Sequence, residues 1–401
     1  MFSFFNSGVS FLLLIILAKF ILPDDYGRLS IFNTIVTFLG YFIALSTTGY
    51  ESITFFRKNR REFTSDFTAI HIIATFVFLF FSIVILVGGE KLASLLSLSV
   101  NLLWVALVIS YTGVYVLMIL SYYRVRQKVC QYGIISCSSA ALNFVLALFF
   151  VVIMNDGWVG RVYSQLLCSI MASIIALYLY RRYRLLNFSN QSRQRFMNII
   201  LWGVPLIPHM AAIWIRQGLD RYIIESSHSM TEVGLFSFAL NLVNIIIIIG
   251  SSFNNSFSVE IYQVLSSGLK AAEKKRTLYR KSQKMIVVFL VATVVVVLGC
   301  TLLVPFALPT YSKALPYFMI LSIYGFVQCL YFLVVNYLFY YKKNKEIMYT
   351  TFGTSIIHLL LSLLLTKYSL FYTCVLYVFI QILIVGTIYY RSRKVIIAKL
   401  I

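Results

Sequence analysis

Twelve long apolar stretches run along this chain of 401 residues and leave little room for any other kind of structure. A helix needs roughly 20 mostly apolar residues to cross the hydrocarbon core of a bilayer. The stretches that meet this length cover residues 2–22, 29–50, 67–88, 98–121, 134–154, 159–180, 196–217, 233–253, 285–306, 313–340, 347–366 and 370–390. The sequence therefore predicts an all-α, multi-pass membrane protein with about 12 transmembrane helices.

The composition excludes the soluble alternatives. Hydrophobic residues make up 60% of the chain and charged residues 12%, whereas soluble domains carry about 45–50% apolar and about 25% charged residues. A water-soluble enzyme, a disordered chain and a secreted disulfide scaffold are therefore excluded. The six cysteines contain no C-x-x-C pair, so we expect small buried hydrophobes and predict no metal site. The first residues lack the features of a cleaved signal peptide, so the first apolar stretch is expected to be retained.

The basic residues predict the orientation in the membrane. With the first end in the cytoplasm, 26 of the 34 Lys and Arg fall on the cytoplasmic side and six on the other. Cytoplasmic loops collect such residues, so both termini are expected in the cytoplasm. The net charge of +21 then reflects topology and contact with anionic lipids, and no nucleic acid partner is predicted. Tyr122-Tyr123, Tyr340-Tyr341 and Tyr389-Tyr390 are expected to anchor helices in the aromatic belt.

An internal repeat divides the chain. The segment Asp25-Tyr-Gly-Arg-Leu-Ser30 returns as Glu232-Val-Gly-Leu-Phe-Ser237, and each opens an even-numbered helix. Two halves of six helices would share one orientation, which is the parallel-repeat design of secondary transporters. We predict an N-terminal lobe (1–182), a cytoplasmic linker (183–195), a C-terminal lobe (196–392) and a tail (393–401).

Polar residues continue the repeat inward on both helices. Their spacing of i, i+4 and i+7 puts each trio on one helix face, where it either lines a shared cavity or holds helices together. The two trios are Ser30, Thr34 and Thr37 in the first half and Ser237, Asn241 and Asn244 in the second.

Ionisable residues inside the spans are the other candidate functional groups, because they are costly in a bilayer. The candidates are Lys19, His209, Arg216, Asp220, Arg221 and His358. The two cations at helix ends could instead snorkel to the interface, Asp220 and Arg221 could form a surface pair, and His358 could satisfy an interhelical hydrogen bond. Pro205 and Pro208 are expected to kink the seventh helix, either as a gate or as a packing distortion.

The chemistry of these groups favours a transporter over an enzyme. Hydroxyls, amides and fixed cations suit sugars and phosphate or carboxylate groups, and no carboxylate lies clearly inside a predicted span. The sequence contains no Walker A, H-E-x-x-H or G-x-S-x-G motif, so ATP-driven transport and the corresponding hydrolases are not indicated. The loops on the outer side are short, which disfavours an external transferase.

Three segments resemble a known family. They are Leu17–Asn33 (LAKFILPDDYGRLSIFN), Trp202–His209 (WGVPLIPH) followed by Asp220–Ile224 (DRYII), and Glu232–Ser237 (EVGLFS). In order and spacing they resemble bacterial polysaccharide and O-antigen repeat-unit flippases of the Wzx type. These flippases belong to the multidrug/oligosaccharidyl-lipid/polysaccharide exporter (MOP) superfamily, which also contains MATE transporters. The chain departs from the family in lacking a short polar lead before the first helix.

The resemblance implies two six-helix bundles around a central cavity in the bacterial inner membrane. It implies alternating access that carries undecaprenyl-diphosphate-linked oligosaccharides to the periplasmic leaflet for O-antigen of lipopolysaccharide, capsule or exopolysaccharide. It also implies a proton or sodium gradient as driver without a bound cofactor, and a polysaccharide polymerase and a chain-length regulator as partners. The cavity cation corresponds to Arg216 or Lys19, and the family's acid–arginine pair to Asp220 and Arg221. A multidrug or metabolite antiporter and a membrane glycosyltransferase or polymerase remain the alternatives.

Overall fold

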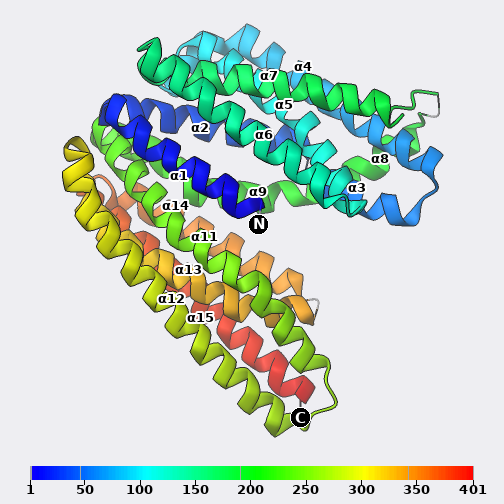
Figure 1. Cartoon of the computed structure of the whole chain (residues 1–401), viewed down its shortest axis with the longest axis vertical. Helices are drawn as coiled ribbons and strands as arrows, with labels where there is room; N and C mark the ends of the chain where they lie inside the picture. The colour runs from blue at the N-terminus through cyan, green and yellow to red at the C-terminus, as the bar shows by residue number, and fades with distance from the viewer. Residues whose placement is uncertain (1, 46, 190, 342, 401) are drawn as a thin grey trace. The chain divides into compact units, whose positions relative to one another are not determined.

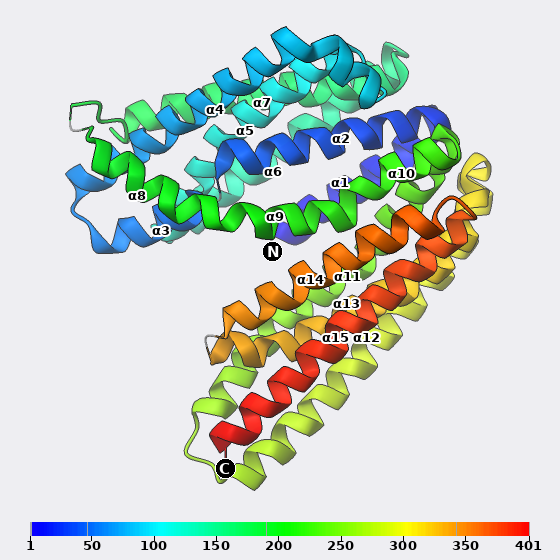
Figure 2. The ribbon, with the colours of Figure 1, turned by 180° about the vertical axis from the view of Figure 1, so that it is seen from behind.

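The computed structural model is helical along nearly its whole length and divides into two compact units, residues 1–214 and 215–401 (Figures 1 and 2). It describes residues 2–45, 47–189, 191–341 and 343–400. Within these ranges, the side chains at positions 3, 4, 48, 53, 205, 208, 209, 213, 217, 344 and 396–400 are not described. No β-strand occurs in the described ranges. The predicted all-α class is confirmed.

The first unit is a bundle in which α5 packs against α2, α4 and α7, and α1 packs against α6. Its helices are α1 (Phe2–Phe20), α2 (Pro23–Ala44), α3 (Thr47–Arg57), α4 (Arg60–Leu95), α5 (Val100–Val125), α6 (Val129–Leu148), the π-helical turn η1 (Phe149–Ile153), α7 (Gly157–Arg182), α8 (Arg193–Gly203), the 3₁₀ turn η2 (Val204–Leu206) and α9 (Ile207–Trp214).

The second unit is built around α13, which packs against α11 and α15 (Figure 2). Its elements are the π-helical turn η3 (Ile215–Leu219), α10 (Asp220–Ser227), α11 (Met230–Ser266), α12 (Ala271–Ala307), the 3₁₀ turn η4 (Pro309–Ala314), α13 (Leu315–Tyr340), α14 (Asn344–Leu365) and α15 (Leu370–Leu400).

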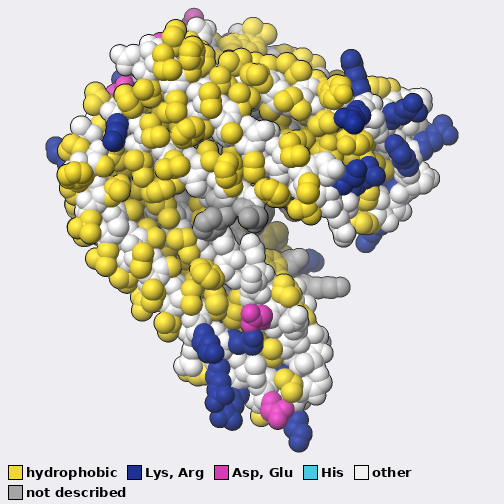
Figure 3. Space-filling model, viewed as in Figure 1, with side chains coloured by type: hydrophobic (Ala, Val, Ile, Leu, Met, Phe, Trp, Pro, Cys, Tyr) yellow, Lys and Arg dark blue, Asp and Glu magenta, His cyan; other side chains and the backbone are white. Residues whose placement is uncertain are grey.

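The lengths of these helices fit a membrane protein. Among the described residues, 10 helices are long and apolar enough to cross a bilayer, and Phe5–Phe20 forms a shorter apolar helix. The remaining predicted span, 196–217, is divided among α8, η2, α9 and η3. On α12, the side chains of Leu302 and Phe306 are 76% and 93% exposed, as expected for a surface that faces lipid. Figure 3 shows hydrophobic side chains over most of the visible face, with Lys and Arg gathered at one end of each unit.

The boundary between the units lies later than the sequence predicts. Residues 183–214, assigned to the linker and the second lobe, pack with the first unit because their polar groups bond to it. The Asn187 side chain donates to the Ser65 hydroxyl at 3.1 Å, and the Trp214 indole donates to the Thr34 carbonyl at 3.0 Å. Hydrogen bonds between segments so distant in sequence leave no local signal of the boundary.

The repeat is visible in the helix starts. The helices α2 and α11 begin at Pro23 and Met230, which are 207 positions apart, the same offset as Ser30 and Ser237. Both serines are buried, whereas Thr37 and Asn244, at the ends of the two trios, are exposed.

One of the tyrosine pairs expected in the aromatic belt has a different role. Tyr122 and Tyr123 are buried, with rings packed against Phe63 and Tyr183. The expectation is wrong for this pair because the neighbouring aromatic side chains cover it. Tyr389 and Tyr390 are exposed, at 54% and 67%, as a membrane-interface anchor requires.

Close packing in the second unit depends on small residues. A Cβ added at Gly250 of α11 would collide with the Sγ atom of Cys329 on α13. A Cβ added at Gly325 would come within 2.8 Å of Val243. Small residues at these two positions therefore allow the backbones of α11 and α13 to approach, as is common between helices in membranes.

Gly250→Ala should therefore lower the thermal stability of the detergent-solubilised protein. Gly299→Ala on α12 is the matched control, because nothing lies within 4 Å of a Cβ at that position. Both substitutions gain the same helix propensity, so the difference between them, about 1–3 kcal/mol, isolates the overpacking cost. Equal melting temperatures would mean that α11 and α13 do not need this contact.

Candidate functional site

A buried carboxylate forms the centre of the candidate site in the second unit. Asp220, the first residue of α10, is 1% exposed. One carboxylate oxygen lies 2.7 Å from Nε2 of His358, and the other accepts the Ser362 hydroxyl at 2.5 Å. His358 and Ser362 are four residues apart on α14, so helical geometry places both on the face that meets α10. The tertiary fold thus pairs two residues that the sequence suggested separately.

Hydrogen bonds extend this cluster along the second unit. The Ser362 hydroxyl lies 3.2 Å from that of Thr366, which lies 2.8 Å from the hydroxyl of Thr373. Nε2 of His228 donates to the Thr366 carbonyl at 2.6 Å. His228 is exposed and follows the last residue of α10. The hydrogen-bonded groups therefore run from the buried carboxylate to the surface at this end of the unit.

Arg216 joins the cluster through its backbone and a tyrosine. The Tyr377 hydroxyl donates to the Arg216 carbonyl at 2.5 Å, and the Tyr377 ring meets His358 edge-on, with 5.1 Å between ring centroids. Arg216 lies in η3, a π-helical turn of a kind that frequently occurs at functional sites. Its Nε atom is buried and has no hydrogen-bond partner among the described residues. This Nε–H group is therefore a donor that a ligand could use.

Asp220 and Arg221 do not form a surface pair. Asp220 points into the unit, while Nε of Arg221 donates to the hydroxyl of buried Ser237 at 3.2 Å. The expected acid–arginine unit is therefore divided between two partners, one on α14 and one on α11. Ser237 belongs to the second polar trio, which connects that repeat to the charged cluster.

A carboxylate and an imidazole meet here in a site closed to water, and histidine is a common proton shuttle in proteins. Intramembrane pairs of this kind mark ion pathways and proton relays. In the described parts of the chain, no group of three or more His, Cys, Asp or Glu residues is placed to hold a metal ion.

The first unit differs from the second at the position of this cluster. At the repeat offset of 207, Asp220 and Arg221 correspond to Leu13 and Leu14 of α1. The two units therefore share a helical plan but differ in the chemistry at this position. This difference favours a function specific to the second unit.

The other predicted site residues are dispersed. Lys19 is exposed at the end of α1, which favours the snorkelling alternative. The hydroxyls of Thr34 and Thr37 donate to carbonyls of their own helix, at 2.9 and 2.8 Å. Asn241 is half-buried, and its side-chain oxygen lies 3.5 Å from the amide of exposed Asn244.

Three predicted positions fall on side chains that the structure does not describe. They are the gate or kink residues Pro205 and Pro208 and the candidate His209.

Sequence reasoning missed two buried acids in the first unit. Glu51 of α3 is 1% exposed, and the groups that act on its charge include Ser121 and Arg124. Asp66 of α4 is also 1% exposed. Residues 51–65 were expected to form a loop, but 51–57 and 60–65 are helical, with a turn at 58–59 between them, so both acids lie in helices. Each acid lies between an aromatic residue and a serine in the sequence, which is a weak signal of burial.

Asp66 holds two cations at the basic end of the first unit. Its oxygens accept Nζ of Lys58 at 2.6 Å and Nε of Arg195 at 2.7 Å. Burial alone would lower the pKa of Lys58, but the hydrogen bond and the charge of Asp66 raise that pKa above its ordinary value. Since Arg195 is the last residue of the predicted linker, its bond to Asp66 fixes the linker to α4.

Together, the apolar helices, the repeated plan and the buried charged cluster define a multi-pass membrane protein with a polar site inside one bundle. The family model described as polysaccharide biosynthesis protein matches residues 1–259, and the chain belongs to this family. Two relatives come from Haemophilus influenzae. The protein named Lsg locus putative protein 1 is 24% identical, with 96% of this chain and 94% of the relative covered. An uncharacterized membrane protein is 23% identical, with 88% and 84% covered.

Solved structures share the fold at low sequence identity. An inward-facing multidrug resistance MATE transporter of the MOP superfamily is 12% identical with a TM-score of 0.76, covering 98% of this chain and 95% of its own. The lipid II flippase MurJ in an inward closed conformation is 11% identical with a TM-score of 0.77, covering 98% and 86%. The chain therefore has the fold of this MATE transporter and of MurJ.

Proposed function

We propose that the protein is a flippase for undecaprenyl-diphosphate-linked oligosaccharide repeat units. The observation that carries the proposal is the combination of a polysaccharide biosynthesis family with the fold of MATE transporters and MurJ. A chain of this family that is built like a transporter moves a glycan precursor across the membrane without making a bond. The repeat units supply O-antigen, capsule or exopolysaccharide. A polymerase and a chain-length regulator are the partners that would use the product.

The proposed setting is the bacterial inner membrane, with both termini in the cytoplasm. The basic ends of the two units support this orientation, because Lys and Arg concentrate on the cytoplasmic side and contact anionic lipids there. The substrate then enters from the cytoplasmic leaflet and leaves on the periplasmic side by alternating access.

Proton coupling at Asp220 and His358 is part of the proposal. Both carboxylate oxygens already accept hydrogen bonds, whereas hard cations prefer sites built from several oxygen ligands. Binding of a proton requires only the carboxylate and the imidazole of this pair. In proteoliposomes, an imposed pH gradient should therefore drive translocation, and a sodium gradient without a pH gradient should not.

The test of the flippase proposal is mass spectrometry of undecaprenyl-linked oligosaccharides from cells that lack this protein. A complete but unpolymerised unit should accumulate, protected from a membrane-impermeant glycosidase. An unchanged pool would contradict the proposal and favour a drug or metabolite antiporter. Truncated units would favour a glycosyltransferase or polymerase.

Arg216→Ala should abolish translocation while the protein still reaches the membrane. Arg216 is half-buried and its Nε atom has no partner among the described residues, and a pyrophosphate group would accept from it. Arg216→Lys should restore part of the activity, because lysine keeps the charge but lacks the bidentate geometry. Lys19→Ala is the control, since this cation is exposed. Normal surface polysaccharide with Arg216→Ala would rule out this role.

A further inference from the structure

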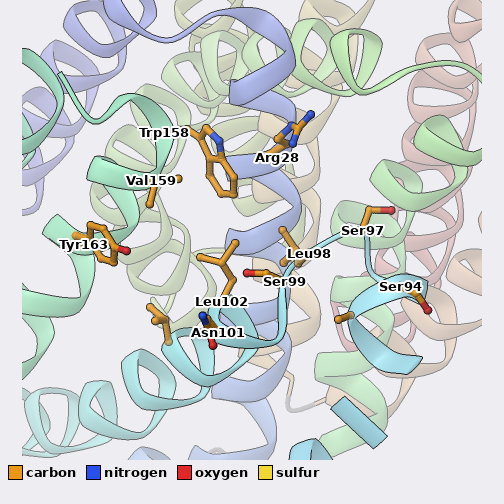
Figure 4. Close-up of a pocket in the computed structure, with 12 residues that line it drawn as sticks. Arg28, Ser94, Ser97, Leu98, Ser99, Asn101, Leu102, Trp158, Val159 and Tyr163 are labelled. Carbon is orange, nitrogen blue, oxygen red and sulfur yellow. The ribbon is translucent and has the colours of Figure 1, made fainter. Parts of the chain in front are cut away.

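A polar pocket lies in the first unit, at the end opposite to its basic loops (Figure 4). The start of α2, the turn between α4 and α5, and the start of α7 form its walls. Its volume is about 620 Å³, within the range of roughly 300–1,000 Å³ that is typical of small-molecule sites. All of its lining residues belong to one unit, so the pocket is separate from the Asp220 cluster.

The lining combines aromatic rings with short polar side chains. Trp158 and Tyr163 come from α7 on one side, and Ser97, Ser99 and Asn101 come from the α4–α5 turn and the start of α5 on the other (Figure 4). Aromatic rings of this kind present an apolar face and a polar edge. Hydroxyl and amide groups can both donate and accept hydrogen bonds.

Two polar groups of the lining lack hydrogen bonds that such groups usually form within a protein. Ser99 is the N-cap residue of α5, yet its side chain makes no capping hydrogen bond. Caps of this type normally accept a backbone N–H group, so the exposed Ser99 hydroxyl can reach a ligand without breaking a cap. The indole N–H of Trp158 also forms no hydrogen bond with the residues that the structure describes.

The charges at the rim favour a neutral ligand. Arg28 lines the pocket, and its Nε atom donates to Asp24 at 3.2 Å, with both side chains about half exposed. The pair has no net charge, yet the remaining N–H groups of Arg28 can form charge-assisted hydrogen bonds. A neutral molecule rich in hydroxyl groups meets these conditions better than an anion, because the ion pair with Asp24 already balances the charge of Arg28.

A pyranose ring has this chemistry. One face of the ring presents C–H groups that an indole can cover, and its rim carries hydroxyls that serine, asparagine and arginine can bond. We propose that the pocket binds one neutral pyranose residue, with Trp158 under the ring and Ser99, Asn101 and Arg28 around its hydroxyls. The role of this sugar site in transport, as a subsite for the oligosaccharide on the outer side, rests on the proposed function.

The binding test uses saturation-transfer difference NMR on the purified full-length protein in detergent. The probes are neutral methyl glycosides of glucose, galactose, mannose and N-acetylglucosamine, with methyl glucuronide as the acidic comparison. At least one neutral glycoside should give a signal, and methyl glucuronide a weaker one. Trp158→Ala should remove the signal, and Trp158→Phe should retain part of it. Phe149→Ala is the matched control, because this exposed aromatic residue lies in η1, shortly before α7, and does not line the pocket.

The outcomes separate this proposal from the flippase proposal. No signal from any neutral glycoside, or an equal signal after Trp158→Ala, would overturn the sugar site whatever the lipid-linked pool shows. A stronger signal from methyl glucuronide would overturn the neutral specificity. If the glycoside binds but the lipid-linked pool is unchanged in cells that lack the protein, the sugar site stands and the flippase proposal fails. If both hold, Trp158→Ala should lower surface polysaccharide at least twofold while the protein level stays constant.

Discussion

Asp220→Ala should lower the free energy of unfolding by about 3–5 kcal/mol, the usual cost of removing one partner from a buried charged pair. The carboxylate is 1% exposed and accepts from His358 and Ser362. Alanine would leave both donors without their acceptor in a region closed to water, and unsatisfied buried donors are costly. Thermal unfolding of the purified protein in one fixed detergent measures the effect. Glu273→Gln on α12 is the control, because this acid is exposed.

Asp220→Asn separates stability from transport. Asparagine keeps the size of the side chain and one acceptor oxygen, so its stability loss should be smaller than that of alanine. It cannot bind and release a proton, so translocation should stop as completely as with alanine. If Asp220→Asn translocates at the normal rate in proteoliposomes, the proposed coupling at this pair is wrong. If Asp220→Ala unfolds at the same temperature as the unchanged protein, the carboxylate does not stabilise the second unit.

Local sequence was sufficient for the parts of the fold that depend on local physics. Apolar runs of about 20 residues predict membrane helices because the bilayer sets their length. The repeated acid-x-Gly motif predicts the equivalent helix starts at Pro23 and Met230, which the structure shows at one offset. Both signals depend on neighbours in the sequence, so neither requires knowledge of the packing.

The geometry of the candidate site could be predicted only in part. The cost of intramembrane charge singled out Asp220 and His358 individually. Their contact joins residues 138 positions apart, and no local pattern encodes which partner a buried carboxylate takes. The adjacent Arg221 was the more obvious partner, but it bonds to Ser237. The pairing is a property of the tertiary fold.

The ion pairs at the basic end of the first unit could not be predicted from the sequence either. The sequence assigned Lys58 and Arg195 to solvated cytoplasmic loops, which is where most basic residues of a membrane protein lie. Burial of Asp66 between them depends on the return of the linker to α4. The hydrogen bonds that hold the linker there include one from Arg60 to the Tyr183 carbonyl at 3.2 Å and one from Gln191 to the Ser65 carbonyl at 3.1 Å. Charge counting could not detect an anchor made of long-range contacts.

Asp66→Ala should destabilise the first unit by about 3–5 kcal/mol and loosen the linker. The carboxylate is 1% exposed, and the Arg195 side chain that it binds is 11% exposed. The Nη1 atom of Arg195 is buried and has no hydrogen-bond partner in the described residues, so loss of the Asp66 contact at Nε leaves the buried cation uncompensated. The pKa of Lys58 is raised, so its share of the stability is complete at neutral pH and disappears only as the pH rises above its ordinary pKa of 10.5.

A double-mutant cycle distinguishes an ion pair from simple loss of packing. If the cost of Asp66→Ala comes from the stranded cation, removing Arg195 as well should restore part of the stability, so that the double variant loses less than the sum of the single variants. Limited proteolysis within residues 183–195 should be fastest in Asp66→Ala and slower in the double variant. Arg193→Ala is the control, because this exposed neighbour has no role in the cluster. Strictly additive costs would show that Asp66 and Arg195 act independently, and the linker would then be held by the neutral hydrogen bonds of Asn187 and Gln191.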